Sequence, residues 1–128
     1  YPIELYGLTA TDTFHYLPAA HHLEQRRSDQ TLSELGDASF DQQWITTAPL
    51  VIVVTGVVAR TEAKYGGVAH DLMLRESGHV VQNILLQATA LGLAAVPVGG
   101  FDPAVIERLM AFPPGEEPLY LIPVGYPR

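Results

Sequence analysis

The chain contains no cysteine among its 128 residues. Without a thiol it cannot form a disulfide framework, a thiolate zinc site or a cysteine nucleophile. The absence of disulfides agrees with a reducing cytoplasm, which is where we expect the protein to work. Hydrophobic residues make up 48% of the chain, so a domain of this length can bury a core without covalent cross-links.

Basic residues are also scarce. Seven Lys and Arg stand against fourteen Asp and Glu, which gives a formal net charge of -7. That sign opposes binding to the phosphates of DNA or RNA, so we expect no nucleic-acid partner. The apolar stretches at residues 50–54 and 84–86 fall far short of the ~20 residues that a membrane span requires, so we expect no membrane partner.

Several catalytic signatures are missing. The sequence has no G-x-x-x-x-G-K-[ST], G-x-G-x-x-G, H-E-x-x-H or G-x-S-x-G motif, which removes several enzyme classes. It also has no internal repeat and no linker, so we expect one domain over residues 1–128. The chain opens with Tyr1 and Pro2 in a pattern typical of a strand interior, and we expect the domain to be truncated at its N-terminus.

What is present predicts alternating strands and helices. Residues 3–10 and 13–17 are rich in β-forming residues around a turn, which predicts a hairpin. Residues 18–28 are polar and are predicted to be irregular and on the surface. Thr31 and Ser39 each precede a short stretch with helical spacing, so both are predicted to be N-caps of short helices.

The second half of the chain predicts a buried centre. Residues 50–59 are β-branched and nearly uncharged, which is typical of a central strand covered on both faces. Residues 70–91 predict a long helix with more than one apolar stripe, buried nearly all round, and Gly92 is its predicted left-handed cap. Residues 93–98 predict a short strand.

The last elements complete a layered fold. Asp102 and Pro103 have the residue types of an N-cap and first helical position, and residues 119–124 predict a final strand. The order of elements predicts a three-layer α/β domain. The long helix has more apolar surface than so small a sheet can cover, so we expect it to form the interface of a homodimer.

Two adjacent glycines are the first candidate for a binding site. Gly99 and Gly100 follow a predicted strand and come just before a predicted helix start. Such a turn lets backbone amides approach a planar or anionic ligand, because no Cβ stands in the way. From the residues alone, a simple tight turn explains the glycines equally well.

Polar residues on the long helix are a second candidate. Glu76 and His79 have the i, i+3 spacing of di-iron bundles, but such sites need a second pair and further carboxylates. A hydrogen-bonded polar pair is therefore the favoured interpretation, with a metal site as a remote alternative. Gln82 and Asn83 are interpreted as packing amides with satisfied hydrogen bonds. The stretch at residues 21–24, with two histidines and a glutamate, is interpreted as a solvated loop rather than a metal site.

Lys64 and Tyr65 are the third candidate. They follow the central strand and are predicted to lie in a loop at its end, where two such groups can be tuned for proton transfer. An ordinary solvated loop is the alternative, and composition favours it.

Five short motifs in order resemble the nitroreductase family of flavoenzymes, most closely its SagB-type dehydrogenase branch. They are KYG at 64–66, ExGHxxQN at 76–83, ALGL at 90–93, VGGFD at 98–102 and LYLIPVGYP at 119–127. The resemblance continues upstream through APL at 48–50, FHY at 14–16 and YPIELY at 1–6, so it covers essentially the whole chain.

The resemblance implies a fold, a cofactor and an activity. Family members fold as a mixed sheet between helices, dimerise through long central helices and hold FMN at the subunit interface. They move hydride through flavin N5 between NAD(P)H or an organic donor and an acceptor. The implied small-molecule substrate is an azoline, a nitro compound or a quinone. The matching positions imply FMN contacts at Val98, Gly99, Gly100 and Arg128, and an acid/base pair at Lys64 and Tyr65.

The sequence also departs from the family. Members carry an Arg-Arg-Ser-x-Arg segment that binds the FMN phosphate and a Pro-Ser-Ala-Gly-Gly stretch upstream, and neither occurs in these 128 residues. Each missing charge-assisted hydrogen bond is worth roughly 1.5–3 kcal/mol. A second function class therefore stays open: a catalytically silent dimerisation or binding module that kept the fold and lost the flavin.

Overall fold

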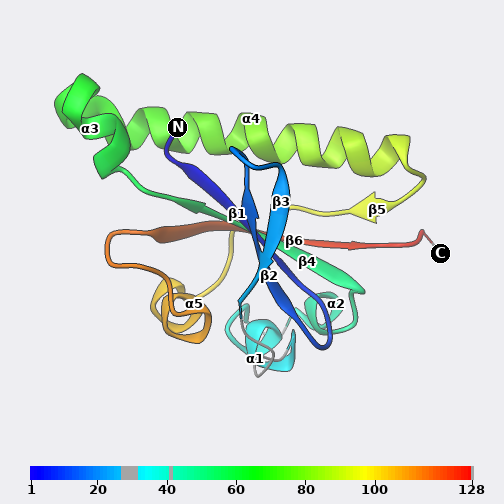
Figure 1. The fold of residues 1–128 in the computed structure, drawn as a ribbon. Coiled ribbons are helices and arrows are strands. Elements are labelled where there is room, and N and C mark those ends of the chain that lie inside the picture. Colours follow the sequence, from blue (N-terminus) through cyan, green and yellow to red (C-terminus); the bar gives the residue numbers. More distant parts are fainter. Residues whose placement is uncertain (27–31, 41, 128) are drawn as a thin grey trace.

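A computed structural model of the chain describes residues 1–26, 32–40 and 42–127 (Figure 1). Strands and helices alternate along it. The strands are β1 (Ile3–Leu8), β2 (Thr13–Leu17), β3 (His22–Gln25), β4 (Leu50–Gly56), β5 (Ala94–Ala95) and β6 (Glu117–Gly125). The helices are α1 (Leu32–Asp37), α2 (Gln43–Thr46), α3 (Ala59–Tyr65), the 3-10 turn η1 (Gly66–Val68), α4 (Ala69–Ala90) and α5 (Pro103–Met110).

The described strands form a six-stranded sheet in the order β3-β2-β1-β4-β6-β5. Every neighbouring pair is antiparallel, so the mixed sheet predicted from the sequence is wrong in this respect. The centre of the sheet is β4, where Val53 pairs with Tyr6 of β1 on one side and with Leu121 of β6 on the other. This position confirms the prediction of a central strand, although the strand ends at Gly56 rather than at residue 59.

The sheet lies between two layers of helices, which confirms the three-layer α/β fold. Figure 1 shows α4 running across one face, while α1, α2 and α5 lie on the other. Side chains of β4 alternate between the two layers: Val51 and Val53 pack in the cluster with α1 and α5, and Val54 packs with Val81 of α4. This alternation explains why the strand is apolar on both faces.

The N-terminal half contains both confirmed and corrected predictions. The hairpin of β1 and β2 is confirmed. Residues 18–28 are exposed where described, but β3 forms within them because His22–Gln25 pairs with β2. Ser39 does not cap a helix, since its hydroxyl donates to the carbonyl of Leu35 at 2.7 Å. Thr31, the other predicted cap, lies outside the described residues.

The long helix is confirmed in extent and corrected in burial. It runs over Ala69–Ala90, and Gly92 follows it with φ 72° while the amide of Leu93 bonds back to Ala88 at 2.8 Å. In the single chain α4 is not buried nearly all round, because Leu86 keeps 59% of its surface exposed and Leu74 is also exposed. The sheet covers one face of the helix, and Leu74 and Leu86 stay open among polar residues on the rest of its surface.

The C-terminal elements follow the sequence closely. Asp102 caps α5 by accepting hydrogen bonds from the amides of Ala104 and Val105, as predicted. The strand predicted at residues 93–98 shrinks to the two residues of β5, and Val98 forms an isolated bridge to Leu121. None of the helices in the described part of the chain is both long and apolar enough to span a membrane.

Candidate functional site

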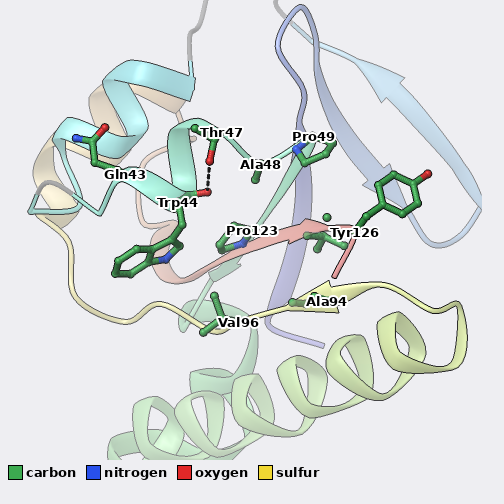
Figure 2. A pocket seen from close by; sticks show the side chains of 12 residues that line it. Gln43, Trp44, Thr47, Ala48, Pro49, Ala94, Val96, Pro123 and Tyr126 are labelled. Atoms are coloured by element: carbon green, nitrogen blue, oxygen red, sulfur yellow. Dashed lines mark hydrogen bonds between the residues drawn. The ribbon is translucent and has the colours of Figure 1, made fainter. Parts of the chain in front are cut away.

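An open groove of about 830 Å³ lies where β5 and the end of β6 meet α2. Figure 2 shows Pro123 and Ala48 in the middle of the groove, with Trp44 and Tyr126 on opposite sides. Three segments far apart in the chain build it. The lining residues are Gln43, Trp44, Thr47, Ala48, Pro49, Ala94, Ala95, Val96, Pro123, Val124, Gly125 and Tyr126.

Two prolines weaken the pairing at the edge of the sheet beside the groove. The amide of Val96 reaches the carbonyl of Pro123 at 3.4 Å, a long bond, and Pro123 has no N–H with which to return one. Pro97 follows directly and also lacks a donor, and the pairing continues at Val98, which bridges to Leu121.

The groove is uncharged along its described lining. None of its lining side chains is Asp, Glu, Lys, Arg or His. Two exposed aromatic side chains that carry a polar atom line it: Trp44, which is 53% exposed, and Tyr126, which is 80% exposed. Exposed rings beside an apolar floor suit a flat aromatic ligand, since rings stack well and their polar tips can stay in water.

Gly99 and Gly100 follow the segment that lines the groove, and nothing in the described structure requires them to be glycine. Neither has a positive φ, unlike Gly66 or Gly92. A Cβ at either position would meet no described atom closer than 3.9 Å. The two glycines lie in the short connection between the bridge at Val98 and the N-cap of α5 at Asp102, so a simple connecting turn stays open as the alternative.

The backbone groups of Gly99 and Gly100 differ in their hydrogen bonds. Within the described residues the amides of Gly99 and Gly100 donate no hydrogen bond. The carbonyl of Gly100 accepts a bond of 2.9 Å from the side-chain amide of Gln42, which also donates to Ser39 at 2.8 Å. Gln42 thus ties the start of α2 to the glycine turn and fixes two sides of the site together.

The remaining predicted site residues are not all near the groove. Val98 is buried and exchanges two backbone bonds of 2.8 and 2.9 Å with Leu121. Lys64 and Tyr65 do not line the groove and are not in a loop: they form the last turn of α3, both exposed, with the Lys64 ammonium 5.1 Å from the Tyr65 ring centroid. Arg128 lies outside the described residues.

The polar residues of α4 differ from their predicted role. Gln82 and Asn83 are exposed, so they are not buried packing amides in the single chain. Glu76 is half-buried and His79 is exposed. In the described part of the chain, no group of three or more His, Asp or Glu side chains is placed to hold a metal ion.

A buried polar network that the sequence did not single out lies across β1 and β2. Burial alone would raise the pKa of Glu4, but a hydrogen bond with His15 and the Arg60 guanidinium outweigh it and hold that pKa below its usual value. Burial raises the pKa of the Tyr6 phenol, and its hydrogen bond to Glu116 raises it further. The hairpin register, which pairs Tyr6 with His15, is the signal that could have located this network.

The groove residues were also missed, because no local pattern marks them. Trp44 lies in the short stretch with helical spacing that follows Ser39, and half of its surface is exposed. Tyr126 lies in the C-terminal motif at 119–127, and nothing in that motif indicates a groove. The three segments meet only when the sheet has formed.

Comparisons with known proteins give a consistent family. The family model described as "Nitroreductase family" matches residues 4–126. A curated protein of Methanocaldococcus jannaschii with the name "Putative nitroreductase" is 33% identical over 132 aligned positions, which cover 98% of this chain and 65% of that protein. The chain therefore spans just under two thirds of the length of this relative.

Solved structures share the fold. A crystal structure described as "a putative nitroreductase" from Anabaena variabilis superposes with a TM-score of 0.92 at 24% identity, covering 97% of this chain and 27% of that one. A chain of the E. coli microcin synthetase McbBCD complex with truncated pro-MccB17 bound gives a TM-score of 0.87 at 21% identity, covering 100% of this chain and 53% of that one.

Proposed function

The chain belongs to the nitroreductase family, and we propose that it serves as an FMN-dependent oxidoreductase of the SagB-like branch. In this proposal the reaction is hydride transfer to or from a small organic substrate, either an azoline or a nitro or quinone compound, with NAD(P)H as a possible electron donor. When bound, FMN supplies the redox step, because its N5 can accept and return hydride. The residues of the chain bind and orient it.

The observation that carries the proposal is the pairing of an uncharged groove with an unobstructed glycine turn. The volume of about 830 Å³ falls within the range of cofactor sites. The indole of Trp44 offers a stacking surface. The open space at the Cβ positions of Gly99 and Gly100 lets a ring edge approach their unpaired amides. The residues present therefore fit the ring portion of a flavin.

The phosphate portion has a different requirement. A phosphate needs a cation or several donors, and no charged side chain lines the described groove. We assign this contact to Arg128, which follows the lining residue Tyr126 by two positions. The same absence of charge favours the second candidate function, a silent dimerisation or binding module that does not hold a flavin.

A second copy of the chain is part of the proposal. Leu74, Leu86 and Leu91 stay exposed on or just after α4 although all three are large and apolar. Large apolar side chains left exposed in the single chain can be covered by a second copy. We propose a homodimer through α4, with the groove near the contact between subunits.

Lys64 and Tyr65 are proposed as the acid/base pair of the reaction. Both are solvent-accessible at the end of α3, and their polar atoms lie on adjacent side chains. The hydride donor or acceptor must also lose or gain a proton, and a Lys–Tyr pair can deliver or take it.

Trp44 gives a direct test because it is the single tryptophan of the chain. Flavin-free protein is titrated with FMN, and tryptophan emission and flavin absorbance are recorded together. Stacking of the ring against Trp44 should quench most of the emission with saturation, and Trp44→Phe should still bind flavin by absorbance after dialysis. Free N-acetyltryptophanamide corrects for light absorbed by the flavin itself.

Riboflavin provides the matched comparison, because it has the ring without the phosphate. If Arg128 binds the phosphate, FMN should bind about 10-fold or more tightly than riboflavin, and Arg128→Gln should remove the difference. Absence of saturable quenching and of retained flavin at about 100 µM would contradict the flavin proposal and leave the silent module.

A further inference from the structure

A second cavity of about 200 Å³ lies beside the β1–β2 hairpin, and it shares no lining residue with the groove. It is built between the β1–β2 hairpin, the residue after β3, and the chain that leaves α5. A cavity of about 150 Å³ is already large enough to hold benzene. This one therefore has room for one substituted ring.

One wall of the cavity is aromatic and rigid. Tyr6 stacks on His15 with ring centroids 4.5 Å apart, and Phe112 lies 5.0 Å from Tyr6 at an angle of 48°. The Tyr6 hydroxyl donates to the carboxylate of Glu116, which is buried and also accepts a bond of 2.5 Å from Thr55. Because the Tyr6 ring contacts His15 and Phe112 and its hydroxyl is bonded, this ring is held in place in the wall of the cavity.

Among the described residues that line the cavity, Arg26 carries a positive charge. Its Nη2 donates to Nδ1 of His15 at 3.1 Å, and its Nε lies 2.9 Å from a carboxylate oxygen of Glu24. A guanidinium has five N–H donors, so these two contacts orient the group and leave others for a ligand. The Glu24 pair is about half exposed on each side, which is the kind of ion pair that contributes little and is readily exchanged.

The backbone beside the cavity is held in a sparsely populated conformation. Ala111 has φ 49° and ψ 49° at the end of α5, a left-handed conformation that is uncommon for alanine. This turn directs Phe112 and Pro113 into the wall of the cavity. The conformation ends α5, because the amide of Ala111 bonds back to the carbonyl of Glu107, and it sets the position of this part of the wall.

We propose that this cavity binds a small aromatic monocarboxylate, with its ring against Tyr6 and Phe112 and its carboxylate on the guanidinium of Arg26. The ring replaces water on an apolar wall, and the carboxylate takes the N–H groups that Glu24 and His15 leave open. The site is independent of the groove and of any flavin bound there.

Benzoate is the probe, and calorimetry on the full chain is the measurement. We expect a dissociation constant on the order of 1 mM or lower, which is within reach of a ligand of this size. Arg26→Gln should weaken binding about 10-fold or more. Glu24→Gln should tighten it about 2- to 5-fold, because it removes the carboxylate that competes for Arg26.

Controls separate a specific site from general effects. Arg108→Gln removes an exposed cation of α5 that does not line the cavity, and it should leave the dissociation constant unchanged. Benzamide, which has the ring without the charge, should bind at least 10-fold more weakly than benzoate. Circular dichroism and Trp44 emission check that each variant is folded. The proposal is overturned if benzoate shows no heat at 10 mM, if Arg26→Gln binds it as wild type does, or if benzamide binds equally well.

Discussion

Nε2 of His15 lies 2.7 Å from Oε2 of Glu4, on two neighbouring strands of one hairpin. Arg26 donates to the other ring nitrogen, so the imidazole proton sits on Nε2 and is donated to the carboxylate. Glu4 in turn binds Arg60, which comes from α3. One carboxylate therefore connects β1, β2 and the helix that carries the proposed acid/base pair.

Acid should weaken the fold through Glu4. Its pKa is lowered from the usual 4.5, so its contribution to stability is fully present above pH 4.5 and is lost as the pH falls through the lower folded-state pKa. Glu4→Gln should cost about 1–3 kcal/mol of unfolding free energy at pH 7 and much less at pH 3. Urea unfolding at both pH values measures this. An equal cost at both pH values would contradict the role of the charge.

Gly100 should accept a side chain without loss of stability. Its φ is not positive and a Cβ there meets no described atom closer than 3.9 Å, so Gly100→Val should change the unfolding free energy by no more than about 0.5 kcal/mol. If a flavin ring approaches this turn, the same variant should bind FMN about 10-fold or more weakly, by Trp44 quenching. Gly67→Val, at another open position, is the matched control. Undiminished FMN affinity in Gly100→Val would remove the turn from the site.

The open face of α4 predicts the oligomeric state. Leu86→Glu should convert a dimer at about 10 µM into a monomer that keeps its circular dichroism spectrum, because the residue is exposed in the single chain but would be buried between two chains. Leu23→Glu makes the same change at an exposed position of β3 and should leave the dimer intact. Light scattering measures both. A wild-type protein that is monomeric at 100 µM would disprove the interface.

The contact between α1 and α2 predicts that one substitution in α2 compensates for a destabilising substitution in α1. A Cβ on the buried Gly36 would lie 2.1 Å from Cγ2 of Thr46, so Gly36→Ala should destabilise the fold by about 1–3 kcal/mol. Thr46→Ser removes that methyl group and keeps the hydroxyl that donates to Gln43. The double variant should recover most of the loss, as chemical denaturation would measure. Simple additivity of the two changes would contradict the steric explanation.

Lys64 and Tyr65 are tested by turnover of the flavin-loaded protein. Lys64→Ala and Tyr65→Phe should each lower the rate about 10²–10⁴-fold if the pair transfers a proton, while the flavin spectrum and the dimer stay unchanged. Arg75→Ala, an exposed cation on α4, controls for general charge effects. Normal turnover in both variants would make the pair an ordinary exposed helix end.

The elements that the sequence predicted well are those with a local chemical signal. Asp102 and Pro103 start a helix with their own side chains, and Gly92 ends one with its own φ. The strand β3 has no such signal, because its residues are polar and exposed and only the pairing with β2 makes them a strand. The helix α3 was not predicted. The glycines after Tyr65 indicated a loop, and Lys64 and Tyr65 were included in that loop although they belong to the helix.

The candidate site also has one part that the sequence predicts and one part that it does not. The glycine turn could be located from the order strand, Gly-Gly, helix. The groove could not, because Trp44, Val96 and Tyr126 are neighbours only through the sheet. Burial of the long helix was overestimated for a related reason: apolar periodicity shows how much surface a helix must cover, and it does not show whether the same chain covers it.

The position of β6 beside β4 has a consequence for how the chain folds. Thr55 and Glu116 bond to each other although they are 61 positions apart, so the pairing of these strands closes a loop that contains α3, α4 and α5. Closing such a loop costs roughly 4 kcal/mol in chain entropy. The contacts between the two strands stabilise the chain only after this cost has been offset. Because the paired residues of β4 and β6 are far apart in the sequence, we expect their pairing to be the slow step of folding. The hairpin of β1 and β2 joins neighbouring residues and can form earlier and faster.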